Sequence, residues 1–153
     1  MHNRRRILIF PLPLLLLCLA SCSNDPYQVS LSGSAKVSDA VHEAVTAATQ
    51  YYGTGKLTDS EKTQIAKYLD TVTDANMIFR KNVISAHNTG VLGGQAYVTY
   101  AQQFVDAVPT DPTVFQYKSS DAQKEFATVL GAVKTALNGI SLAIQNAQAK
   151  GVK

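Results

Sequence analysis

Apolar side chains recur every three or four residues over most of this chain, a spacing that places them on one face of an α-helix. The most regular stripe follows Ser119-Ser120 and extends to about Ala149. Its spacings alternate strictly between four and three, so the pattern predicts one long helix with a buried face. The stripe consists of Phe126, Leu130, Val133, Leu137, Ile140, Ile144 and Ala147.

A second long helix is predicted from Asp59 until its stripe fades near His87. Thr58 and Glu61 have the spacing of a capping box, in which each side chain bonds the other residue's backbone N–H at a helix start. Asn76 falls inside the apolar stripe, and we interpret it as a buried polar side chain that fixes the register of packing. The stripe itself comprises Ile65, Leu69, Val72, Phe79, Val83 and Ala86.

Two shorter helices are predicted, one from about Ser38 to Tyr52 and one from Gln95 to Val108. Ser38 can cap the first, and Gly53-Thr54-Gly55 ends it. The second is less clear, because residues 96–100 and 113–117 have strand-like composition. A small hairpin over residues 95–117 is therefore the competing prediction.

The segment before these helices is rich in serine and carries no long apolar stripe. Tyr27, Val29 and Leu31 alternate as in a strand, but a single strand has no partner to satisfy its backbone. We therefore predict a flexible tether over residues 22–37. The predicted fold of residues 38–153 is an all-α, up-and-down bundle of about four helices, two long and two short, with each short helix along one half of the second long helix.

The first 21 residues have the layout of a secretion signal. Arg4, Arg5 and Arg6 form a basic head, and residues 7–17 form an apolar run too short to span a bilayer. An ordinary signal peptide cut near Ala20 is the simpler alternative for this layout.

Leu19-Ala20-Ser21-Cys22 resembles the lipobox of bacterial lipoproteins. The resemblance implies cleavage between Ser21 and Cys22, and fatty acids such as palmitate on Cys22 that anchor the chain in a membrane. Two or more acyl chains give stable anchoring. Ser23, where an aspartate would favour the inner membrane, implies the outer membrane, with the domain facing the periplasm.

Charge changes the picture once the signal is removed. The full chain has a net charge of +3, from 14 basic and 11 acidic residues. Arg4, Arg5 and Arg6 leave with the signal, so 11 basic residues face 11 acidic ones. A balanced charge argues against nucleic acid as a partner and against a polybasic membrane patch. No later stretch is expected to cross a membrane.

The sequence offers no constellation for catalysis. Cys22 is expected to be acylated, no Gly-x-Ser-x-Gly, phosphate-loop or haem motif occurs, and no cofactor is implied. Asp39 and His42 share a helix face as metal ligands can, but they lack the matching second pair that a di-metal bundle needs. We predict a protein that is not an enzyme, with no catalytic residue and no metal site.

Tyrosine is the most suggestive residue type, because it joins an apolar body to a polar tip and suits interfaces. Tyr97, Tyr100 and Tyr117 form the candidate partner surface. The predicted function is a non-enzymatic protein-interaction module in the cell envelope, similar to the small helical pilotins in size and anchor; exclusion and immunity lipoproteins fit equally well.

Two alternatives to a protein-interaction module stay open. One is a binding protein for a small apolar or glycan ligand held between the helices. The other is a structural envelope tether ending in Lys153, which loosely resembles the murein lipoprotein.

Overall fold

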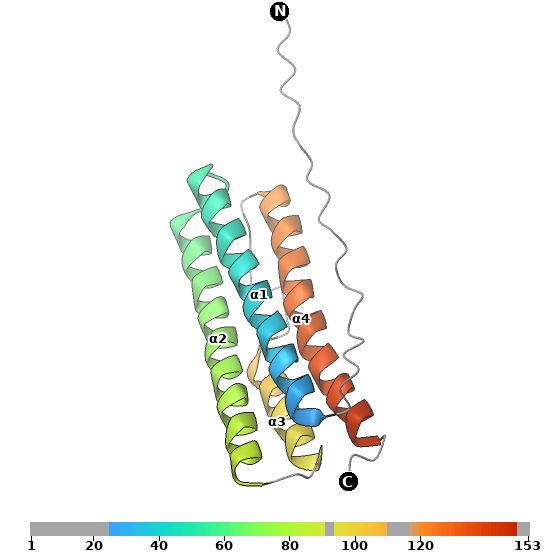
Figure 1. Ribbon diagram of the computed structural model, residues 1–153. Helices are drawn as coiled ribbons and strands as arrows, with labels where there is room; N and C mark the ends of the chain where they lie inside the picture. Colours follow the sequence, from blue (N-terminus) through green and yellow to red (C-terminus); the bar gives the residue numbers. More distant parts are fainter. Residues whose placement is uncertain (1–24, 91–93, 110–116, 118, 150–153) are drawn as a thin grey trace, which may run out of the picture.

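The computed structural model describes residues 25–90, 94–109, 117 and 119–149. These residues form four helices that alternate in direction along one axis (Figure 1). The prediction of an all-α helical bundle is confirmed, and the described residues contain no strand. The helices are α1 (Pro26–Gly53), α2 (Asp59–Asn88), α3 (Gly94–Ala107) and α4 (Ser120–Ala149).

Most of the predicted helix ends are confirmed. At the start of α2 the backbone N–H of Thr58 donates to Glu61 Oε2 (2.6 Å), and the N–H of Glu61 donates to Thr58 Oγ1 (3.3 Å). At the start of α4 the N–H of Ala122 donates to Ser119 Oγ (3.3 Å). Residues 95–107 are helical, so the competing hairpin is wrong over that stretch; residues 110–116 lie outside the described residues.

The predicted tether is wrong from residue 26 onward, because α1 begins at Pro26 rather than at Ser38. Asp25 caps the helix by accepting a hydrogen bond from the N–H of Tyr27 (3.0 Å), and proline suits the first turn because it lacks an N–H that would need a partner. The bundle therefore has three long helices and one short one. Residues 22–24 lie outside the described residues.

The first half of α1 is held by a stripe of small residues. Ser30, Gly33, Ser34 and Val37 are all buried, at spacings of three and four. The stripe brings α1 so close to α4 that a Cβ at Gly33 would overlap the side chain of Ile140. Serine and glycine do not count as apolar, so the apolar pattern alone does not predict a helix over this stripe.

Asn76 links α2 to this half of α1. Its side-chain amide donates to the carbonyl oxygen of Ser34 (3.1 Å) and to Ser38 Oγ (3.0 Å). The predicted burial of Asn76 is confirmed. A buried amide loses water on folding, so only registers that restore these hydrogen bonds are favourable.

The core has two parts along the bundle axis. The larger part lies where all four helices overlap, and the smaller part lies at the end where α1, α2 and α4 meet without α3. As predicted, α3 runs along the second half of α2; α1 spans the whole of α2 instead of its first half (Figure 1). Central members of the larger part are Val37, Phe79, Phe104, Leu137 and Ile144, and those of the smaller part are Leu57, Ile65, Ala122 and Phe126.

One segment of α4, Ser120–Asn146, is long and apolar enough to cross a membrane by length and composition, contrary to our expectation. In the bundle its apolar stripe is buried against α1 and α3. A helix that forms part of a protein core can meet the same criterion of length and composition. The buried stripe includes Phe126, Val133, Leu137, Ile140 and Ile144.

Leu137 tests whether the stripe of α4 is the core. Its side chain is 2% exposed, so Leu137→Ala should lower the free energy of unfolding by about 2–5 kcal/mol through lost burial and the cavity left behind. Leu142→Ala on the same helix is the control, because Leu142 is 60% exposed. Urea denaturation measures both variants, and equal losses would contradict the assignment of the two faces.

Gly33 tests whether the start of α1 belongs to the packed domain. Gly33→Ala should destabilise by about 1–3 kcal/mol, because Ile140 must move to admit the methyl group. Gly131→Ala is the matched control: nothing lies within 4 Å of its added Cβ, so alanine should stabilise that helix by about 1 kcal/mol. A tether would instead leave Gly33→Ala close to wild type in thermal melting.

Candidate partner-binding face on α2

The three predicted surface tyrosines do not form one surface. Tyr97 is 3% exposed and belongs to the larger core, whereas Tyr100 on the same helix is half-buried. Tyr117 is half-buried at the α3-free end, where its ring stacks on Phe126 with centroids 5.5 Å apart. The prediction that Tyr97 lines a partner surface is wrong, because the apolar stripe of α3 turns it inward.

Tyr117 is a packing residue in this structure. Burial raises its pKa to about 12, and the negative charge of Glu61 adds to the effect. A tyrosine that resists ionisation in this way packs against the smaller core and does not act as a reactive group.

Exposed large apolar side chains instead point to α2. Among the described residues Met77 is 59% and Ile78 61% exposed, and they are adjacent. Ile84, two turns further along α2, is half-buried. The other exposed large apolar side chains, Val45, Tyr52 and Leu142, stand apart on α1 and α4.

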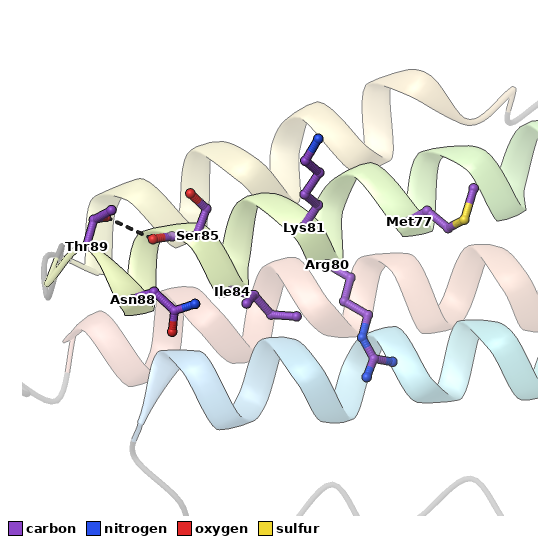
Figure 2. Close-up of a pocket in the computed structure, with 7 residues that line it drawn as sticks. All are labelled: Met77, Arg80, Lys81, Ile84, Ser85, Asn88 and Thr89. Carbon is purple, nitrogen blue, oxygen red and sulfur yellow. Dashed lines mark hydrogen bonds between the residues drawn. The ribbon is translucent and has the colours of Figure 1, made fainter.

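Met77 and Ile84 share the outward side of α2 with polar and basic neighbours, which Figure 2 shows. Met77, Lys81, Ile84 and Asn88 are spaced by four, three and four, so they follow one another along the helix opposite its buried stripe. They border a shallow, open hollow of about 590 Å³. We call this surface the α2 face: Met77, Ile78, Arg80, Lys81, Ile84, Ser85, Asn88 and Thr89.

The charge of the α2 face has one sign. Residues 75–88 contain Arg80 and Lys81 and no carboxylate, whereas Asp70 and Asp74 lie one to two turns earlier. In Figure 2 the Arg80 side chain extends toward α1 and that of Lys81 in the opposite direction. The α2 face therefore combines exposed apolar surface with cationic groups on both of its flanks.

Sequence reasoning missed the α2 face. The available signal was the Met77-Ile78 pair, which falls outside the buried stripe of its own helix. The pair alone does not indicate a binding site, because exposed apolar residues are common on the surfaces of soluble proteins.

The remaining predicted sites are placed only in part. Ser21 and Cys22 lie outside the described residues. Asp39 and His42 are exposed on α1, and the described part of the chain contains no group of three or more His, Cys, Asp or Glu side chains that could hold a metal ion.

Comparison with protein-family models, with curated proteins and with solved structures finds no match to this chain.

Tyr117 predicts how stability depends on alkaline pH. Its folded pKa lies above the usual value near 10, so the unfolded chain releases its proton first and stability falls as the pH rises from 10 through about 12. Tyr117→Phe keeps the ring stack and removes the hydroxyl, so it should lose less stability between about pH 9 and about pH 11 than wild type. Urea midpoints at the two pH values measure this, and equal losses in both proteins would contradict it.

Proposed function

We propose that this protein is a non-enzymatic interaction module of the bacterial envelope, anchored by lipid on Cys22 in the outer membrane and facing the periplasm. Its α2 face binds a segment of another envelope protein. The lipobox resemblance supports the anchor, and the exposed pair Met77 and Ile78 supports the binding role. A pilotin-, exclusion- or immunity-like role fits this proposal.

Exposure of Met77 and Ile78 is the observation that carries the binding role. Methionine and arginine are enriched in protein interfaces, where a few desolvated side chains supply most of the affinity. The spacing along α2 matches recognition of an amphipathic helix, whose own apolar residues recur every three or four positions.

The charge of the α2 face selects the partner. Arg80 and Lys81 flank the apolar residues, and residues 75–88 carry no carboxylate, although Asp74 lies one turn before Met77 and Ile78. The complementary partner is an amphipathic segment with acidic side chains beside its apolar ones. Such complementarity speeds association and disfavours basic competitors.

A second copy of this chain fits the face less well. Cys22 is separated from α1 by Ser23, Asn24 and Asp25 alone, a reach of about 14 Å. Two copies, each held this close to the same membrane, have the same orientation relative to it. Paired side by side through α2 about a two-fold axis, they would set Arg80 of one copy beside Lys81 of the other on each flank, and like charges repel.

A protein segment is also favoured over a small enclosed ligand. The hollow lies on the outward side of α2 and not between the helices, so it offers no enclosure for an apolar or glycan molecule. The alternative of a structural tether depends on Lys153, which lies outside the described residues.

A photo-crosslinking amino acid placed at Met77 or Ile78 tests the α2 face in living cells. We expect one dominant adduct with a different protein, and we expect Lys81→Glu to reduce its yield at least about tenfold by reversing the complementary charge. The same amino acid at Leu142, which is 60% exposed on α4, is the matched control and should give little adduct.

Three outcomes would contradict this assignment. Equal adduct yields from positions 78 and 142 would mean that the face has no selectivity. An adduct of twice the mass of this chain would identify a second copy as the partner. An adduct yield that Lys81→Glu leaves unchanged would contradict the acidic character of the partner but not the position of the binding face.

A further inference from the structure

The start of α1 limits how far the bundle can stand from its anchor. A tether up to residue 37 would have reached roughly 50 Å, but α1 begins at Pro26, so the reach from Cys22 falls to about 14 Å. The helices are much longer than this: α1 has 28 residues and is about 42 Å long. The end of the bundle that carries Pro26 must therefore lie close to the membrane.

This anchor-proximal end gathers the first turns of α1 and α3 and the last turns of α2 and α4 (Figure 1). The ring of Tyr27 stacks on that of His87, with centroids 3.8 Å apart, so the anchored end of α1 is joined directly to the last turn of α2. The α2 face begins at this turn and extends from Thr89 to Met77.

The two halves of the bundle differ in charge. The anchor-proximal stretches of the long helices, residues 26–38, 75–88 and 135–149, contain no carboxylate. Their charged groups are Lys36, Arg80 and Lys81, with His87 in the last turn of α2. At this end Asp25, which caps α1, is an exposed carboxylate; in the opposite half the exposed carboxylates include Asp39, Glu43, Asp59, Asp70, Asp74 and Asp121.

This difference in charge distinguishes a bundle that lies on its side on the bilayer from one that stands on its end. A bundle lying on α2 would press Asp70 and Asp74, with Lys67 beside them, against the lipid headgroups, and one lying on α1 would press Asp39 and Glu43 against them. Anionic headgroups repel these carboxylates and attract nearby lysine and arginine. Standing on the anchor-proximal end keeps these four carboxylates away from the headgroups, leaves Asp25 near them, and brings Arg80 and Lys81 toward them.

We propose that the bundle stands on its anchor-proximal end, which makes the α2 face a juxtamembrane site. This orientation rests on the proposed function, because it requires the lipid on Cys22. Residues 77–88 span about 17 Å of helix, so the face lies within about 30 Å of the bilayer even with Ser23–Asp25 fully extended. The partner must therefore present its acidic amphipathic segment within that distance of the bilayer.

Energy transfer from a single tryptophan to the bilayer tests the orientation. The chain contains no tryptophan, so Asn88→Trp and Ser60→Trp each introduce a unique donor at an exposed position near opposite ends of α2. The acylated protein is placed in phosphatidylcholine–phosphatidylglycerol vesicles with dansylated headgroups. Transfer from position 88 should be at least about threefold more efficient, because ~42 Å of helix separates the two positions.

A longer tether provides the matched control. A flexible glycine–serine segment inserted between Ser23 and Asn24, long enough to restore a reach of roughly 50 Å, should reduce transfer from position 88 and leave the thermal melt unchanged. Equal transfer from positions 60 and 88 with the native tether would overturn the upright orientation.

Vesicle sedimentation distinguishes the two proposals. The wild-type chain should sediment with vesicles and Cys22→Ser should not; failure of the wild type to sediment would overturn the anchor and the orientation together. If the native chain sediments and crosslinks through Ile78 but transfers energy equally from both positions, the proposed function stands and the orientation is wrong.

Discussion

The close contact between the first half of α1 and its neighbours is the interaction on which the rest of the structure depends. Gly33 lets the backbone of α1 approach Ile140 of α4, and Asn76 of α2 donates to Ser34 and Ser38. Small side chains and one buried amide thereby hold a segment that could not pack through large apolar residues. Without this contact residues 26–37 would be linker rather than part of the bundle.

Because residues 26–37 are helical, the bundle has two ends that differ in charge. The end that begins at Pro26 carries Arg80 and Lys81 and has Asp25 as the carboxylate that caps α1, while the far end carries most of the acidic groups. A net charge of zero for residues 23–153 conceals this separation. At any binding surface the distribution of charge matters more than its sum, because screening confines each group's influence to about 10 Å.

The second long helix serves two surfaces. One side carries the core stripe with Phe79 and Val83, and the opposite side carries Met77, Ile78 and Ile84 with basic neighbours. Burying the second side as well would require another helix, and the described bundle places none there (Figure 1). An apolar pair that its own fold leaves uncovered is a natural position for a partner.

The sequence by itself determined the elements with strong local signals. The capping box at Thr58 and the alternating stripe that contains Leu137 fix α2 and α4, because capping and periodicity act within one helix. The start of α1 was decided by tertiary structure, since burial of Ser30 and Gly33 depends on how closely α4 approaches. The inward turn of Tyr97 and the exposure of Met77 likewise depend on which neighbours pack against α3 and α2, and no local pattern encodes a neighbour's position.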